Sequence, residues 1–237
     1  MSTTTPGQHD GTVARPKTST GRTGRPPVTS REQIVAVARG LIEQDGWEKL
    51  TVRKLAAEIG IGATTLYHHV RDKDDLVVLL VNDYAAQIGR PPLPGDPRER
   101  IVVAATTMHD VLTSWPWAAE ALATDGFLAR VDEPALWMVE AILSGAIDHG
   151  CTPEQAVHVF RCLWYYTVGE TIVRARSAPR RREWEQATER EPLFGHVDTA
   201  RIPHLAAIGQ RWGEWAGKDN YAEGLRAFVD GLLARCG

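Results

Sequence analysis

The sequence predicts an all-α protein, with a three-helix head that contains a helix-turn-helix and a larger helical domain behind it. Apolar residues recur at helical spacing through most of the chain, and no run alternates apolar and polar residues for long enough to form a strand. Four prolines and two glycines interrupt the helical pattern at residues 89–97. A chain of 237 residues has room for one small module and one larger domain. We therefore expect a head over residues 30–75 and a body over residues 76–237.

Charge is distributed unevenly between these two parts. The formal net charge is −3, but residues 1–90 hold 12 Lys and Arg against 10 Asp and Glu, whereas the remainder holds 15 against 20. A faintly basic head on an acidic body is typical of a protein that touches nucleic acid at one end only. Neither a signal peptide nor an apolar stretch of about 18 residues is present, so we expect a cytoplasmic protein without membrane contact.

Cysteine is scarce in this sequence. The three cysteines are Cys151, Cys162 and Cys236, which are too few and too scattered to predict a disulfide framework in a chain of this size. We therefore expect reduced thiols in a reducing cellular interior.

Residues 1–29 are predicted to form a disordered basic arm. They consist largely of Thr, Ser, Gly, Pro and Arg and show no apolar periodicity, so they cannot bury enough surface to offset chain entropy. The arm carries Arg22 and Arg25 on an extended backbone, and such arms reach into the minor groove of DNA. A tail that only aids solubility is the alternative interpretation.

A helix-turn-helix is predicted within the head, after a first helix that runs from Ser30 to about residue 45. Thr51 can cap the next helix by accepting a backbone N–H bond, and Gly60 ends it. A further short helix runs from about Thr64 to Val70. Two helices joined by a turn of three or four residues that contains glycine form this motif.

The second helix of the motif presents small, hydroxylic and imidazole side chains, with cations on either side. This surface suits the major groove of DNA, with phosphates at its edges. Any exposed short helix is polar, which is the alternative interpretation. The side chains are Ala63, Thr64, Thr65, Tyr67, His68 and His69, flanked by Arg53, Lys54, Arg71 and Lys73.

The run T-V-R-K-L-A-A-E-I-G-I-G-A-T-T-L-Y-H-H-V-R-D-K-D-D-L, residues 51–76, resembles the DNA-binding domain of the tetracycline-repressor (TetR) family. This resemblance implies a regulator that binds double-stranded DNA. It assigns contacts with base edges to Arg53, Ala63, Thr64 and His68. It assigns contacts with phosphates to Thr51, Thr65, Tyr67, His69 and Lys73.

The next helix is predicted over residues 76–88 and is apolar nearly all round, which indicates burial on two sides. We expect it to connect the head to the body. Asp72 can cap this helix, and the helix dipole stabilises the carboxylates that follow in its first turn. We prefer capping to a magnesium site here, because the second carboxylate cluster that such a site needs is absent.

The body is predicted to be all-helical. The 153–176 helix has two apolar faces, and the last helix has one wide apolar stripe. These two helices of one subunit can therefore pack against the same two helices of a second subunit as a four-helix bundle. The interleaved charges of residues 177–200 predict a solvated loop. The helices are expected at about 98–114, 115–124, 132–149, 153–176, 203–216 and 220–235.

The body also resembles the regulatory domain of the tetracycline-repressor-like subgroup, in H-D-V-L-T-S-W-P-W-A-A-E, E-Q-A-V-H-V-F-R-C-L-W-Y-Y-T-V-G-E, I-P-H-L-A-A and Y-A-E-G-L-R-A-F-V-D-G-L-L. This resemblance implies dimerisation through the last two long helices and a ligand cavity in each subunit. Pockets are mostly apolar with a few polar groups. Our ligand-binding candidates are therefore His109, Phe127, Met138, Phe160, Trp164 and Glu170, with ordinary core packing as the alternative for each aromatic residue.

The sequence thus favours a ligand-responsive DNA-binding regulator, most simply a repressor that binds an inverted-repeat operator as a homodimer and is released by a small, largely apolar effector. An all-helical enzyme with a DNA-binding head is the first alternative, but no catalytic motif supports it. A DNA-binding module without ligand control is the second. We expect no cofactor and no metal, because His158 and Cys162 alone do not make a metal site.

Overall fold

The computed structural model describes residues 1, 3, 29–124, 126–181 and 198–236. Its described residues form helices and no strand, and none of these helices is long and apolar enough to cross a lipid bilayer. The head contains α1 (Arg31–Asp45), η1 (Trp47–Lys49), α2 (Val52–Ile59) and α3 (Ala63–Tyr67), followed by α4 (Lys73–Gln87). The body contains α5 (Pro97–Ser114), α6 (Pro116–Leu122), η2 (Phe127–Ala129), α7 (Glu133–His149), α8 (Pro153–Ser177), η3 (Ala178–Arg180), α10 (Pro203–Ile208), η4 (Gly209–Arg211), α11 (Trp212–Ala216) and α12 (Tyr221–Leu233).

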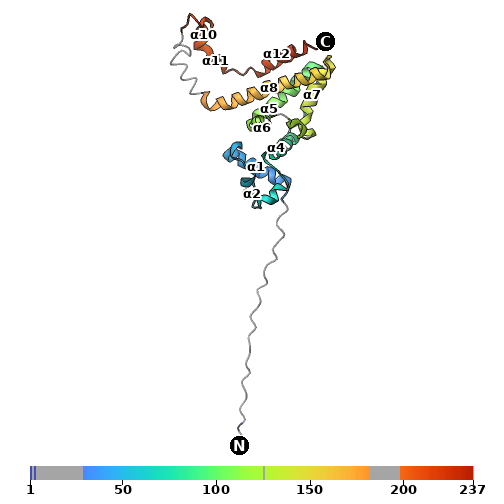
Figure 1. Ribbon diagram of the computed structural model, residues 1–237, viewed down its shortest axis with the longest axis vertical. Helices are drawn as coiled ribbons and strands as arrows, with labels where there is room; N and C mark the ends of the chain where they lie inside the picture. The colour runs from blue at the N-terminus through green and yellow to red at the C-terminus, as the bar shows by residue number, and fades with distance from the viewer. Residues whose placement is uncertain (2, 4–28, 125, 182–197, 237) are drawn as a thin grey trace.

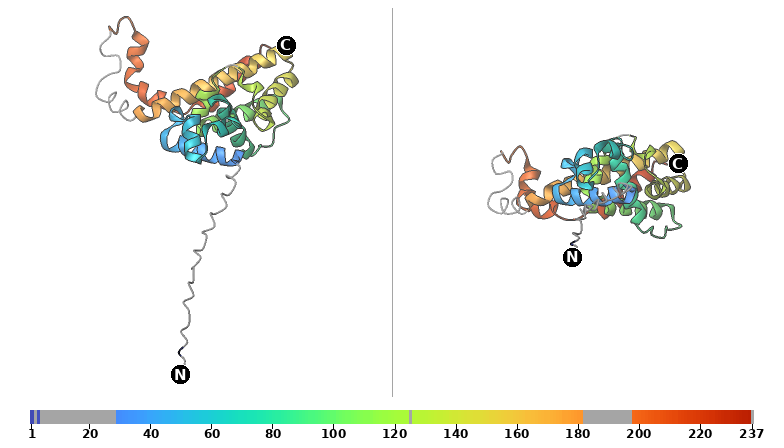
Figure 2. Two further views of the ribbon diagram at one scale, coloured as in Figure 1. Left: turned by 60° about the horizontal axis from the view of Figure 1, so that its bottom comes forward. Right: turned by 90° about the horizontal axis from the view of Figure 1, so that it is seen from below.

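The predicted all-α architecture is confirmed, and Figure 1 shows the head below the body. In the body α5, α7 and α8 pack against one another, and α12 lies against α5 and α8. The short helices α10 and α11 lie beyond one end of α8, outside this bundle, in both Figure 1 and Figure 2. Most of the predicted arm over residues 1–29 and most of the predicted loop over residues 177–200 lie outside the described residues.

Local signals in the sequence determine where the helices of the head begin and end. The Ser30 hydroxyl accepts a hydrogen bond from the Gln33 amide at 3.1 Å, and the Thr51 hydroxyl caps α2 in the same way. Gly60 ends α2 with φ +81°, a conformation that glycine adopts without strain. These caps lie where the sequence predicts them.

The short helix α3 is displaced from its predicted range. It begins at Ala63 and ends at Tyr67, whereas the pattern predicted about Thr64 to Val70. Leu66 and Val70 are both fully buried, and the chain turns between them because Asp72 must be extended to cap α4. His68 and His69 therefore lie in a turn and not on a helix.

Helix α4 contributes to two separate cores. Leu76, Leu79 and Leu80 pack in the core of the head, whereas Val77 packs in the core of the body. The helix begins at Lys73, three residues before the predicted start, because Asp72 caps it. It is therefore packed between head and body along most of its length.

One helix of the body also differs from the prediction. The helix expected over residues 203–216 is broken into α10, η4 and α11. Gly145 of α7 lies against α5, since a Cβ atom there would be 2.8 Å from the Pro97 carbonyl oxygen. That close contact between the two helices requires glycine.

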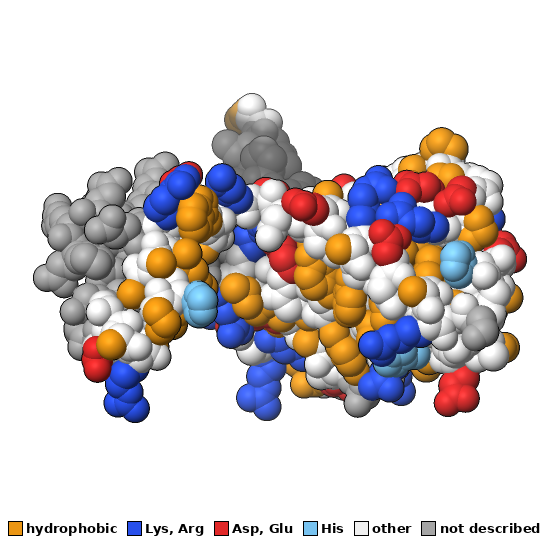
Figure 3. All heavy atoms as spheres, turned by 90° about the horizontal axis from the view of Figure 1, so that it is seen from above, with side chains coloured by type: hydrophobic (Ala, Val, Ile, Leu, Met, Phe, Trp, Pro, Cys, Tyr) orange, Lys and Arg blue, Asp and Glu red, His pale blue; other side chains and the backbone are white. Residues whose placement is uncertain are grey.

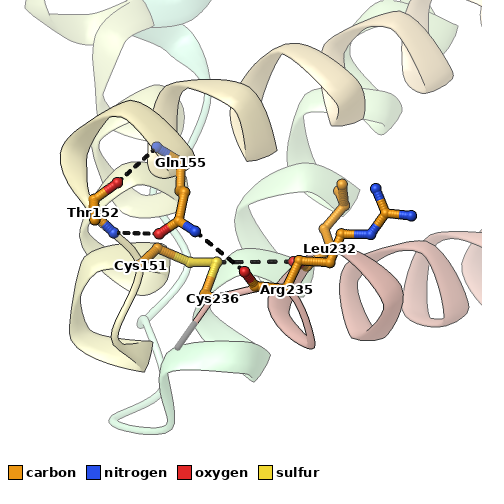
Figure 4. The surroundings of a disulfide bond; sticks show 6 residues. All are labelled: Cys151, Thr152, Gln155, Leu232, Arg235 and Cys236. Carbon is orange, nitrogen blue, oxygen red and sulfur yellow. Dashed lines mark hydrogen bonds between the residues drawn. A yellow bond between two sulfur atoms is a disulfide. The ribbon is translucent and has the colours of Figure 1, made fainter.

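The expectation of three reduced thiols is wrong. Cys151 and Cys236, which are 85 residues apart, form a disulfide with a Cα–Cα distance of 4.6 Å (Figure 4). The bond ties the turn between α7 and α8 to the end of α12, and the Gln155 amide donates a hydrogen bond to the Arg235 carbonyl oxygen beside it. Cys162 is the free cysteine.

Candidate nucleic-acid interface and internal cavity

The exposed side of the helix-turn-helix carries the side chains that the sequence singled out. Arg53 is exposed and has no ion-pair or hydrogen-bond partner within the described part of the chain. Tyr67 is 45% exposed although its neighbour Leu66 is fully buried. The exposed members of this surface are Thr51, Arg53, Thr64, Thr65, Tyr67, His68 and His69, and Ala63 and Lys73 are half-buried.

Two of these side chains also have structural contacts. The Thr51 oxygen accepts the Lys54 amide at 3.1 Å, which leaves its O–H free to donate to a phosphate. The Lys73 ammonium donates to the Trp47 carbonyl oxygen at 3.0 Å and lies 4.2 Å from the centroid of the Trp47 ring. Lys73 is therefore held in one place at the edge of the surface.

Arg71, a flanking cation, is paired with Asp75. Its Nε donates to Asp75 Oδ2 at 2.7 Å, and Arg130 of the body donates to Asp75 Oδ1 at 2.6 Å. The hydrogen bond from Arg71, joined by the one from Arg130, lowers the pKa of Asp75 to about 2. The carboxylate stays charged above that pH and links the head to the body.

An apolar cavity of about 70 Å³ lies inside the body, under α4. Its wall is built from α4, α5, α6, η2, α7 and α8, and it is almost without polar atoms. The lining residues are Val81, Tyr84, Ala85, Ile88, Met108, Val111, Leu112, Trp115, Ala118, Leu122, Phe127, Leu128, Val131, Ala135, Met138, Val139, Phe160 and Trp164.

Four of the six ligand-binding candidates, Phe127, Met138, Phe160 and Trp164, lie in this lining. Sequence reasoning missed the contribution of α4, which supplies Val81, Tyr84 and Ala85. The signal for this contribution was present in the sequence, because a helix that is apolar on nearly all sides can face both a core and a cavity.

The other two candidates, His109 and Glu170, lie apart from the cavity in a polar network. His109 Nε2 is 2.9 Å from Glu170 Oε2, and Glu170 pairs with Arg174 one turn further along α8. The His109 ring stacks on Tyr221 with 3.6 Å between centroids. Burial raises the pKa of Tyr221, whose hydroxyl lies 2.8 Å from the Thr167 hydroxyl. This network joins α5, α8 and α12.

Within the described ranges, no group of three His, Cys, Asp or Glu side chains is arranged to hold a metal ion. His158 Nε2 lies 3.5 Å from Cys162 Sγ, and no third metal ligand lies beside this pair.

Two family models together cover most of the chain. The model described as "Bacterial regulatory proteins, tetR family" matches residues 34–80, and "Tetracyclin repressor-like, C-terminal domain" matches residues 91–236. The chain belongs to the TetR family. Proteins of this family are DNA-binding transcriptional regulators, so the alternative of an all-helical enzyme is wrong.

A curated relative agrees with this assignment along most of the chain. An HTH-type transcriptional regulator of Saccharopolyspora erythraea is 28% identical over 216 residues, which cover 89% of this TetR-family chain and 87% of the relative.

Solved structures of TetR regulators have the same fold. ActR of Streptomyces coelicolor, a TetR family protein in complex with (S)-DNPA, matches with a TM-score of 0.67 at 20% identity, over 88% of this chain and 99% of ActR. BioQ with its double-stranded DNA operator matches with a TM-score of 0.60 at 19% identity, over 87% and 99%. At these identities the likeness concerns the fold alone.

Proposed function

We propose that this TetR-family regulator is a repressor that binds an inverted-repeat operator as a homodimer and leaves it when a small, largely apolar effector enters the body. One observation carries the proposal: α4 begins directly after the helix-turn-helix and ends in the wall of the apolar cavity. We assign DNA binding to residues 30–75, with residues 1–29 as a basic arm, and effector binding and dimerisation to residues 76–237. We place the protein in the cytoplasm, without membrane contact.

In the proposed complex α3 enters the major groove. Arg53 can fork onto guanine O6 and N7, and Ala63 can offer only a methyl contact to thymine. We assign base edges to Arg53, Ala63, Thr64 and His68, and phosphates to Thr51, Thr65, Tyr67, His69 and Lys73. Because a two-fold dimer presents two such helices to successive major grooves, its operator is an inverted repeat. BioQ, which has the same fold, was solved with its double-stranded DNA operator.

We propose that two protomers pair through α8 and α12. Large apolar side chains are exposed on these two helices: Val157, Tyr165 and Val173 on α8 are 50%, 55% and 65% exposed, and Phe228 on α12 is 37% exposed. Figure 3 views the molecule from the side on which α12 lies in Figure 1, and hydrophobic side chains lie among charged ones on this face. Two copies that pair here would bury these groups.

We propose that the small size of the cavity couples effector binding to release from DNA. A cavity of about 150 Å³ holds benzene, and this one measures about 70 Å³. An effector of ordinary size must therefore displace its walls, including Tyr84 and Ala85 of α4. Movement of α4 changes the separation of the two heads of the dimer. The resulting change in DNA affinity can be no larger than the difference between the effector's affinities for the DNA-bound and the released conformation. ActR, which has the same fold, was solved in complex with (S)-DNPA.

The small cavity also favours a second candidate function, a DNA-binding regulator without ligand control. In that case the cavity is a packing void, and no small molecule changes DNA affinity.

The proposed function is tested by selecting bound duplexes from a random pool with the full-length protein. We expect a two-fold symmetric motif and two protomers on each duplex in analytical ultracentrifugation. Selection of an asymmetric motif, or one protomer on each duplex, contradicts the dimer. Failure to prefer any duplex at modest ionic strength contradicts DNA binding by this surface.

Replacement of Arg53 by alanine should weaken binding to the selected duplex by about 1–3 kcal/mol and relax specificity at one base pair in each half-site. The reason is the loss of a bidentate contact with a base edge. Fluorescence anisotropy on duplexes substituted at each position measures both effects. Arg201→Ala, which removes an exposed arginine from the region before α10, is the control and should leave binding unchanged. Equal losses on specific and random DNA would mean that Arg53 contacts a phosphate instead.

Replacement of Ala118 by leucine should fill the cavity and abolish effector binding, because the added isopropyl group takes up the free volume. Compounds that raise the midpoint of thermal unfolding of the unaltered protein should then have no effect on Ala118→Leu. Ala123→Leu makes the same change at an exposed position just after α6 and should bind normally. An equal shift of the midpoint in both variants would place the effector elsewhere.

A further inference from the structure

Two tryptophans meet at the junction of head and body. Trp47 of η1 stacks on Trp117 of α6, with 5.2 Å between ring centroids and 25° between ring planes. Both residues pack against the core of the head and against the core of the body. Among the described elements, α4 is the helix that supplies buried side chains to both cores. The stack of Trp47 on Trp117 is a second contact between head and body, and it does not involve the buried side chains of α4.

On the side of the head, Trp47 holds Lys73. The ammonium lies over the indole ring at 4.2 Å from its centroid and donates to the backbone carbonyl of the same residue at 3.0 Å. An ammonium has three N–H donors, so those not used by Trp47 remain available to a phosphate. A flexible lysine that is held in this way loses less rotamer freedom when it binds DNA.

On the side of the body, the helix that carries Trp117 forms part of the cavity wall. Ala118 and Leu122 of α6 line the cavity, and Trp115 directly before α6 lines it too. Trp117 itself is absent from the lining and contacts Trp47 and Tyr84. A shift of α6 that widens the cavity therefore also moves the ring on which Trp47 rests.

We propose that Trp47 is a positioning residue for the phosphate contact of Lys73, and that its stack on Trp117 makes this contact respond to movement of α6. The inference rests on the proposed function, since it needs Lys73 at a phosphate and a ligand or fluctuation that moves α6. This coupling is distinct from movement of α4. Movement of α4 changes the position of the whole head, whereas the stack acts on the Lys73 ammonium alone.

The first test is the salt dependence of binding to the selected duplex, measured on the full-length protein. Lys73→Ala should lower the slope of log Kd against log salt by about 1 for each protomer. Trp47→Leu should lower the slope by a similar amount and should have no further effect in the Lys73→Ala background. Trp47→Phe retains an aromatic face for the ammonium and should keep the slope. A protein that is only less stable would bind with an unchanged slope.

The second test reaches the stack from the body. Trp117→Leu should weaken DNA binding several-fold in the unaltered background and leave the affinity of Lys73→Ala unchanged, because its effect passes through that lysine. Trp215→Leu, the same substitution at an exposed tryptophan of α11, is the matched control and should affect neither background. If Trp47→Leu fails to fold by circular dichroism, this second cycle still decides the question.

The inference is overturned if Trp47→Leu leaves the slope unchanged, or if the losses from Trp117→Leu and Lys73→Ala add. Those results leave the proposed function intact, provided that the unaltered protein selects a symmetric duplex. If the unaltered protein prefers no duplex, both the proposed function and the inference are wrong.

Discussion

Replacement of Leu66 by alanine should lower the free energy of unfolding of the head by about 2–5 kcal/mol and remove binding to the operator. Leu66 is the buried residue of α3, and its side chain is fully inaccessible to solvent. A helix of five residues has no stability of its own, so it depends on this anchor and on Val70 just after it. Urea unfolding followed by circular dichroism measures the first effect, and anisotropy with the selected duplex measures the second.

Leu93→Ala is the matched control for this prediction. Leu93 is 44% exposed in the segment between α4 and α5, so the same truncation there should change the free energy of unfolding by no more than about 0.5 kcal/mol. If Leu66→Ala retains its affinity for the operator, α3 does not need its buried anchor, and the assignment of DNA contacts to α3 is wrong.

Loss of the disulfide between Cys151 and Cys236 should lower the free energy of unfolding by about 2–4 kcal/mol. The bond closes a long loop, because its two cysteines are 85 positions apart in the sequence, and so it restricts the unfolded chain. The double variant Cys151→Ser/Cys236→Ser should show this loss in urea unfolding, and treatment with dithiothreitol should reproduce it in the unaltered protein. The Cys162→Ser variant, which lacks the free cysteine, should be as stable as the unaltered protein.

The disulfide is also tested by counting thiols. The unaltered protein, denatured without reductant, should react with one equivalent of a thiol reagent, since one of its three cysteines is free. Three equivalents, together with no effect of dithiothreitol on the midpoint of unfolding, would show that the bond does not form.

The sequence predicted the head better than the body for a physical reason. Helix caps such as Ser30, Thr51 and Gly60 are local signals, and each acts within four residues of its own position. The end of α3 was missed because Val70 and Asp72, which lie after it, decide where the chain must turn.

The cavity and the disulfide depend on contacts between distant segments. Met108 and His109 are neighbours on α5, but successive helical residues point about 100° apart, so one lines the cavity and the other stacks on Tyr221. The sequence pattern predicted four of the lining residues, Phe127, Met138, Phe160 and Trp164, and the rotation of each helix decided the rest. Cys151 and Cys236 are brought together only by the packing of α12 against α8, which spacing in the sequence does not report.

The pairing of two cysteines has a practical consequence for the third. Cys162 is a partly exposed thiol on α8, the helix proposed to pair with a second copy. An alkylating reagent used without reductant can therefore modify the protein at one position without any engineered cysteine. The rate of that alkylation, followed while the protein is diluted, reports directly on how well α8 is shielded when two molecules associate.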